Sequence, residues 1–283
     1  MSEMEDLRKT LTLEPIEVNL FRGFSPPTPW PRIFGGQVIA QALMAAYQTV
    51  QGRTCHSLHA YFIRPGDPKA PVLYQVERAR DGKSFTTRRV AAIQHGEQIF
   101  NFAASFQIEE EGFDHQFAMP PVPTADALKD AVDERVAKMP AKVRDMMNKR
   151  PIEMRPVGRS TPEGSPANTA YSVWLRTQID FGDDPVFNQA LLAYASDMGI
   201  LETAMRPHEV SFHTPGMQVA SLDHAMWFHR PVRLRDWHLF AQDAPSSSGA
   251  RGFTRGSVYS EAGALVASVA QEGLIRYRPP EEA

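Results

Sequence analysis

Cysteine is nearly absent from this sequence, which has Cys55 as its only cysteine in 283 residues. One cysteine can form neither an internal disulfide nor a cysteine-based zinc site, so packing must stabilise the fold, and a reducing compartment is expected. An excess of one charge sign is also absent, because 30 Lys and Arg stand against 33 Asp and Glu, for a net charge of −3. This balance disfavours a nucleic-acid partner.

Long hydrophobic runs are absent too. The most apolar stretch, residues 38–47, includes Gln41 and is far shorter than the roughly 20 residues of a membrane-spanning helix. The acidic segment 1–6 lacks the positive charge that opens a secretory signal, and residues 281–283 are not a peroxisomal Ser-Lys-Leu signal. We therefore expect a cytoplasmic protein without membrane insertion.

Several catalytic motifs are missing as well. The sequence has no Gly-x-Ser-x-Gly elbow for a hydrolase nucleophile, no phosphate-binding P-loop and no Gly-x-Gly-x-x-Gly nucleotide fingerprint. The nearest match to a metal motif is His208-Glu-Val-Ser-Phe-His213, whose two histidines are five residues apart, whereas two zinc ligands on one helix face are i and i+4. We therefore expect no metal and no cofactor.

What the sequence does contain is a weak internal repeat. Four pairs of segments share sequence in the same order along the chain: 15–19 with 151–155, 59–65 with 224–231, 85–90 with 253–258, and 99–100 with 265–266. The first pair is 136 residues apart and the others are 165, 168 and 166 apart, so the second copy carries an insertion after the first pair. A repeat of this length predicts one structural plan used twice.

Each copy combines an apolar helix with alternating strands. The predicted helices, residues 34–48 and 188–197, are apolar on almost every face, which is typical of buried helices. The segments that follow alternate apolar and polar residues, which favours antiparallel strands. They cover residues 58–63, 72–77, 85–94 and 98–107 in the first copy, and 225–228, 237–242, 252–260 and 264–276 in the second. The predicted fold class is α+β, a long central helix wrapped by an antiparallel sheet, twice.

A linker of different composition separates the copies. We predict an N-terminal domain at 1–112, a helical linker at 113–150 and a C-terminal domain at 151–283, which carries the candidate site. Thr124 is the expected N-cap of the linker helix, and Pro151 ends it. Its apolar residues recur at near-helical spacing: Leu128, Val132, Val136 and Val143.

Three polar residues of the second copy are candidates for a functional role. Asp197 ends an apolar helix, where a carboxylate loses hydration and needs partners or a raised pKa, although it could instead cap the turn at Gly199. Alternation places Gln271 on the inward face of the last strand, unless a bulge turns it to solvent. Ser221 opens the first long strand of the second copy, where it could also act as a cap.

The segments around these residues resemble the type II acyl-CoA thioesterases. The resemblance implies a double hotdog fold and hydrolysis of medium- to long-chain fatty acyl-CoA by a water held by Asp197, Ser221 and Gln271. It also implies acyl-CoA as the ligand, and we expect a homo-oligomer of double-hotdog chains. Because the first copy has Ser105 where the second has Gln271, we expect one site per chain. The similar segments are 34–37, 59–66, 80–85, 194–199, 223–231, 250–256 and 269–273.

The phosphates of coenzyme A call for basic residues near the site. Several cluster around the Asp81-Gly82 turn, and the second copy has Arg251 and Arg255 in the matching region. A solvated strand face is the alternative explanation of this cluster. The residues predicted to bind substrate are His59, Arg80, Lys83, Arg88 and Arg251.

Two other functions stay open at this point. A hotdog hydratase of enoyl-CoA has a His five residues after its Asp, where this sequence has Glu202. A non-catalytic acyl-CoA-binding protein would have lost site residues, whereas all three are present. Release of free thiol from acyl-CoA separates hydrolysis from both. A water mechanism also leaves Cys55 without a catalytic task.

Overall fold

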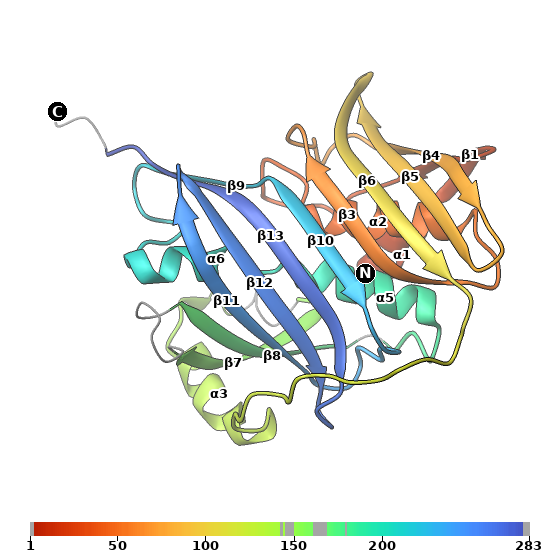
Figure 1. Cartoon of the computed structure of the whole chain (residues 1–283). Helices are drawn as coiled ribbons and strands as arrows, with labels where there is room; N and C mark the ends of the chain where they lie inside the picture. Colours follow the sequence, from red (N-terminus) through yellow and green to blue (C-terminus); the bar gives the residue numbers. More distant parts are fainter. Residues whose placement is uncertain (1–2, 142–143, 145–149, 161–168, 179, 280–283) are drawn as a thin grey trace.

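The strands form one continuous antiparallel sheet. A computed structural model of the chain describes residues 3–141, 144, 150–160, 169–178 and 180–279. The strands of the first half are β1 (Glu14–Glu17), β2 (Leu20–Gly23), β3 (Thr54–Phe62), β4 (Val72–Asp81), β5 (Phe85–Gln94) and β6 (Glu97–Gln107). Those of the second half are β7 (Ile152–Ser160), β8 (Ala170–Thr177), β9 (Met217–Ser221), β10 (Asp223–Phe228), β11 (His238–Ser248), β12 (Arg251–Ser260) and β13 (Leu265–Tyr277). Their order is β1-β2-β4-β5-β6-β3-β10-β13-β12-β11-β8-β7, with β9 beside β13 (Figure 1).

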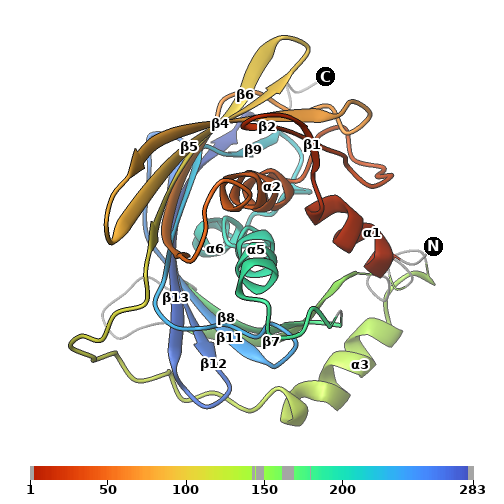
Figure 2. The same cartoon turned by 90° about the vertical axis from the view of Figure 1, so that its right-hand side faces the viewer.

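Two helices fill the concave side of this sheet. They are α2 (Gly35–Tyr47) and α5 (Pro185–Ser196), which lie side by side inside the curve (Figure 2). Twelve of the thirteen residues of α2 are buried, as expected for a helix that is apolar on nearly all faces. Its buried Gln41 is satisfied, because its amide donates to the Thr10 carbonyl and accepts from the Tyr74 hydroxyl, both at 2.6 Å. The shorter helical segments are α1 (Glu3–Leu11), η1 (Asp126–Leu128), α3 (Lys129–Ala137), α6 (Glu202–Met205) and η2 (Arg206–His208).

The two halves repeat one arrangement about the middle of the sheet. The central pair is β3 and β10, with Leu58 opposite Met226. On one side the neighbours are β6, β5, β4 and β2, and on the other they are β13, β12, β11 and β8. A single cluster of buried apolar residues includes side chains from both α2 and α5. The predicted double hotdog fold is confirmed.

The second copy differs from the first at one strand. By the repeat spacing, β3 corresponds to β9 and β10 together, which are interrupted at Leu222. Its carbonyl accepts from the Phe62 amide at 2.9 Å, and its amide donates to the Glu272 carbonyl at 3.0 Å. The interruption leaves Ser221 at the end of β9, next to the middle of the sheet.

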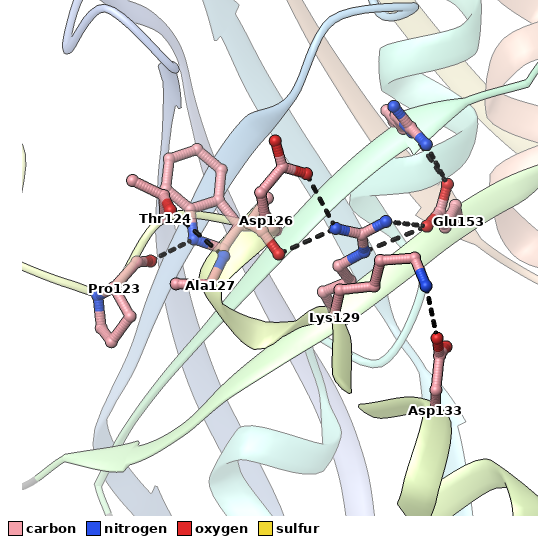
Figure 3. A network of polar contacts seen from close by, with 11 residues as sticks. Pro123, Thr124, Asp126, Ala127, Lys129, Asp133 and Glu153 are labelled. Atoms are coloured by element: carbon pink, nitrogen blue, oxygen red, sulfur yellow. Dashed lines mark hydrogen bonds and ion pairs between the residues drawn. The ribbon is translucent and has the colours of Figure 1, made fainter. Parts of the chain in front are cut away.

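The linker is attached to the second half by polar contacts (Figure 3). The Trp174 indole donates to the Pro123 carbonyl at 2.9 Å, and Arg155 donates to the Ala125 carbonyl at 2.8 Å and to Asp126 at 3.1 Å. The Arg155 guanidinium also donates to the Glu153 carboxylate at 2.9 Å. These bonds fix the start of the linker helix against β7 and β8.

The linker helix is shorter than predicted. Thr124 accepts from the Ala127 amide at 3.3 Å beside η1, but it is not the N-cap of the linker helix: α3 has Leu128 as its N-cap residue, and it ends at Ala137 rather than before Pro151. Leu128, Val132 and Val136 are only half-buried, so little apolar burial supports a longer helix. Val143 lies outside the described residues. The proposed domain boundaries remain a prediction.

No helix in the described part of the chain is both long enough and apolar enough to cross a membrane.

Candidate active site

Asp197 lies where the end of α5 meets the start of α2. It directly follows the last residue of α5, and its Oδ2 accepts from the Gly36 amide of α2 at 2.8 Å. Phe34, the N-cap residue of α2, forms no side-chain cap bond, so this carboxylate caps the helix from the other half of the molecule. A capping role at the Gly199 turn is therefore not what the structure shows.

Two glycines allow this close approach. A Cβ on Gly35 would lie 2.7 Å from Asp197 Oδ2, and one on Gly36 would lie 2.4 Å from the Tyr194 carbonyl oxygen. Cβ atoms essentially never approach another heavy atom this closely. The two helix ends can therefore meet in this way only with glycine at both positions.

The environment makes Asp197 a weaker acid than usual. Burial raises its pKa to about 7, and Gln271, the Gly36 amide and Ser221 each offset part of that rise by favouring the charged form. The residue as a whole is half-buried, but its Oδ1 is fully shielded and forms no hydrogen bond with any described residue. Gln271 and Ser221 thus lie near the carboxylate without a direct bond to Oδ1. A buried carboxylate oxygen without a partner among the described residues is unusual, and a small bound donor such as water would satisfy it.

Ser221 and Gln271 are joined by a hydrogen bond beside the carboxylate. The Gln271 amide Nε2 donates to Ser221 Oγ at 2.7 Å. Gln271 is 1% exposed on β13, so it points inward as its alternation predicted, and no bulge turns it to solvent. The structure thus brings the three residues predicted to hold water into one place.

His224 completes this group, and its role was not predicted from the sequence. Its Nδ1 lies 2.7 Å from Gln271 Oε1 and its Nε2 lies 2.9 Å from Ser196 Oγ. The ring is completely buried, and burial lowers its pKa to about 4. The available signal was strand alternation, which puts His224 on the inward face of β10 with Met226 and Phe228.

Two clefts meet at this group. The larger, about 540 Å³, includes Asp197 in its lining, and we call it the Asp197 cleft. The smaller, about 310 Å³, includes Phe62, and we call it the Phe62 cleft. Five residues line both clefts: Arg32, Ile33, Gly35, Ala220 and Ser221. A substrate with two long arms joined by a reactive bond would fit this layout, with the bond at the junction.

The residues predicted to bind substrate lie elsewhere. None of the five lines either cleft. Arg88 is 1% exposed and bonds to Thr49 and Asp81, so its guanidinium stabilises the fold locally. His59 is exposed and contacts the Trp227 ring edge-to-face. Arg80 and Lys83 are exposed near the β4–β5 turn, and Arg251 pairs with Glu272. Their contact with substrate stays a prediction.

Arg32 is the cation that sequence reasoning missed. It is exposed, lines both clefts and forms no hydrogen bond or ion pair with the described residues. The sequence places it two residues before Phe34-Gly-Gly-Gln37, but nothing in that spacing indicates that two clefts meet there.

The first copy has a different arrangement at the matching positions. Ser105 Oγ lies 2.8 Å from His56 Nε2, where the second copy has Gln271 and Ser221. The residue that follows α2 is Gln48, which is exposed, where Asp197 follows α5. The first copy therefore has no carboxylate at the corresponding place.

Cys55 lies apart from the group around Asp197. Cys55 is buried outside both clefts, its thiol lies 3.4 Å from the Ser57 carbonyl, and burial raises its pKa. Across the described residues, no three His, Cys, Asp or Glu side chains gather as a metal site.

Comparison with known proteins gives consistent matches over the whole chain. A family model described as acyl-CoA thioesterase matches residues 142–274, and one described as acyl-CoA thioesterase N-terminal domain matches residues 26–107. Acyl-CoA thioesterase 2 of Haemophilus influenzae is 41% identical, over 97% of this chain and 98% of its own. Human acyl-coenzyme A thioesterase 8 is 40% identical, over 95% and 88%. The crystal structure of an acyl-CoA thioesterase II from Mycobacterium marinum has a TM-score of 0.80 at 38% identity, and the match covers 98% of this chain and 99% of that one.

Proposed function

The chain belongs to the acyl-CoA thioesterase family, and from that premise we propose that it hydrolyses medium- to long-chain fatty acyl-CoA with a water held by Asp197, Ser221 and Gln271. That it is an acyl-CoA thioester hydrolase follows from the family. The water mechanism rests on one observation: Asp197 Oδ1 is shielded and unbonded among the described residues, next to Ser221 and Gln271 at the junction of two clefts.

The proposed reaction needs no covalent intermediate. Asp197 accepts a proton from the water, whose oxygen forms a bond to the thioester carbonyl carbon. The carbon–sulfur bond of the resulting tetrahedral intermediate then breaks, and the coenzyme A sulfur takes the proton back from Asp197. The products are a fatty acid and coenzyme A, and the carboxylate is restored. A base with a pKa of about 7 suits both proton transfers near neutral pH.

The helix start supports the charge that develops in this reaction. The N-terminus of α2 faces the junction, and its dipole favours negative charge there. The dipole stabilises both the ionised Asp197 and the oxyanion of the tetrahedral intermediate. Ser221 and Gln271 fix the position of the water between the carboxylate and the substrate.

In this proposal each cleft holds one arm of the substrate. The lining of the Asp197 cleft is apolar apart from Arg32, Asp197 and Ser221, and includes Leu201, Phe212 and Val219. This lining suits a fatty acyl chain. Of the two arginines that line the Phe62 cleft, Arg64 pairs with Glu97 at 2.9 Å, whereas Arg32 has no partner among the described residues and is the cation that would attract the negatively charged coenzyme A arm. One such site per chain follows, because the first copy lacks the carboxylate.

Replacement of Asp197 by Asn tests the mechanism, since it keeps the size of the side chain and removes the base. We expect kcat to fall by about 100-fold or more when free thiol is followed with acyl-CoA esters of increasing chain length. The matched control is Asp184→Asn at the other end of α5, where the side chain caps the helix through the Val186 amide. Asn is an equally good cap, so this control should keep its activity.

An Asp197→Asn variant with the turnover of the unmodified protein would contradict the water mechanism. Preference for acetyl-CoA over longer chains would contradict the assigned chain length. Substrate consumption without thiol release would indicate hydration instead of hydrolysis.

The compartment and the assembly belong to the same proposal. The single buried cysteine supports a reducing compartment, for which we propose the cytoplasm. We propose a homo-oligomer of double-hotdog chains, which sedimentation of the purified protein tests directly.

A further inference from the structure

The orientation of the Gln271 carboxamide determines whether a hydrogen-bond donor or an acceptor faces Asp197. An amide has an oxygen acceptor at one end and an NH2 donor of similar shape at the other, so its orientation is set by its neighbours. In the structure Nε2 faces Ser221 and Oε1 faces His224. If the amide were turned over, its oxygen would lie beside the carboxylate, where two acceptors repel.

His224 has the contacts needed to fix this direction. It is completely buried, and each ring nitrogen lies against one polar atom, Gln271 Oε1 at 2.7 Å and Ser196 Oγ at 2.9 Å. The amide oxygen can only accept, so Nδ1 must carry the proton and donate it. Because burial lowers the pKa of His224 to about 4, the ring is neutral near pH 7, and Nε2 must accept from the Ser196 hydroxyl.

Ser196 makes the alternative arrangement possible as well. Its hydroxyl also lies 2.9 Å from the Ala193 carbonyl oxygen. If it donated there, His224 would carry its proton on Nε2, and Nδ1 would accept from a reversed Gln271 amide. The group thus has two self-consistent hydrogen-bond directions, of which only one presents NH2 toward Ser221 and Asp197.

We propose that His224 is a positioning residue of this site, which acts through its Nδ1–H to hold the NH2 group of Gln271 toward Ser221 and Asp197. Ser196, the residue before Asp197 in the chain, supports it by donating to Nε2. His224 lines neither cleft and so acts on the water only through Gln271. This inference deepens the proposed function and rests on the role assigned there to Gln271.

The tautomer of His224 tests the proposal without any measurement of activity. The protein is labelled with 15N-histidine, and long-range 15N–1H spectra at pH 7 distinguish the Nδ1–H from the Nε2–H form. The His224 signals are those missing from His224→Asn. We expect the neutral Nδ1–H tautomer. An Nε2–H tautomer or a protonated ring would overturn the proposal.

Kinetics of three variants test the consequence. His224→Leu removes the donor, and we expect kcat to fall about 10- to 100-fold with KM changed less than about 3-fold, because water positioning is lost while the clefts are intact. His224→Asn places an amide donor near the position of Nδ1 and should recover most of the loss. Ser196→Ala keeps the ring but removes the donor to Nε2, and we expect a smaller fall in kcat.

A second buried histidine provides the matched control. His238 on β11 is 2% exposed, bonds to the Asp236 carbonyl at 2.8 Å and lines neither cleft. If His238→Leu lowers kcat as much as His224→Leu, or if His224→Asn is no better than His224→Leu, the effect is structural and the proposal fails. Thermal unfolding of each variant identifies a loss of folded protein, and the tautomer measurement decides the question if His224→Leu does not fold.

The two proposals fail in different ways. An active Asp197→Asn variant contradicts the water mechanism, whatever the state of His224. Inactive Asp197→Asn and Gln271→Ala variants beside a fully active His224→Leu variant leave the mechanism in place and overturn the role of His224.

Discussion

Asp197 is the residue whose chemistry depends most on the fold around it. On a solvated surface its pKa would be near 3.8, and burial raises it to about 7. The sequence allowed this residue to be singled out, because a carboxylate at the end of an apolar helix is anomalous without any structure. The same reasoning found Gln271 on an inward strand face.

His224 and Arg32 could not be found in that way. A histidine on an inward strand face is indistinguishable in sequence from one that simply packs in the core, and only the contact with Gln271 gives it a role. Arg32 matters because two clefts meet beside it, and those clefts need residues near positions 30, 62 and 220 to come together. Sequence spacing does not contain that information.

The raised pKa of Asp197 predicts the pH dependence of the reaction. In the proposed mechanism Asp197 is a base that acts in its deprotonated form, so kcat/KM should rise with pH and reach half its maximum near pH 7, since this profile reports the pKa of the free enzyme. Ser221 favours the charged form of Asp197, so Ser221→Ala should move the midpoint to higher pH. Initial rates of thiol release from acyl-CoA between pH 5 and pH 9 measure both. A midpoint near that of an ordinary carboxylate would contradict the prediction.

At the scale of helices and strands, the hydrophobic pattern was a good guide. Alternation predicted residues 85–94 as a strand, and β5 has these bounds, while the buried helix expected at 34–48 is α2 at Gly35–Tyr47. The linker helix was predicted too long, because the apolar residues of α3 are only half-buried. Strands β2, β8 and β9 were missed; β8 is buried on both faces, so it lacks the alternation by which the other strands were predicted.

The contact between α5 and α2 predicts the effect of a methyl group at Gly35. A Cβ there would lie 2.7 Å from Asp197 Oδ2 and 2.9 Å from the Phe62 ring, so the carboxylate must move from its bond with the Gly36 amide. We expect Gly35→Ala to lower kcat by about 10-fold or more, because small displacements of a catalytic group are costly. Gly112→Ala is the control, since nothing lies within 4 Å of its Cβ. Equal kcat in the two variants would show that the contact is not required.

At the scale of the whole molecule, the site depends on both halves of the chain. Asp197, Ser221, His224 and Gln271 come from the second half, whereas Gly35, Gly36 and Arg32 come from the first. The repeat in the sequence indicated two similar halves, but not that the start of one central helix is capped by the end of the other. Pairing of β3 with β10 and packing of α2 on α5 create that contact.

This shared construction leads to a prediction about coenzyme A. Arg32 is an exposed cation that lines both clefts, with no partner among the described residues, and its charge attracts the strongly negative coenzyme A. Arg32→Glu replaces attraction by repulsion, so KM should rise by about 5-fold or more at low salt, with kcat within about 2-fold. The increase in KM should shrink as salt is added, because exposed charges are screened.

Arg80→Glu is the comparison, since Arg80 was predicted from sequence to bind the same phosphates but lies outside both clefts. A rise in KM for Arg80→Glu and none for Arg32→Glu would place the phosphates at the β4–β5 turn, away from the junction. The opposite result would mean that a cation from the first half binds the substrate hydrolysed by a carboxylate from the second.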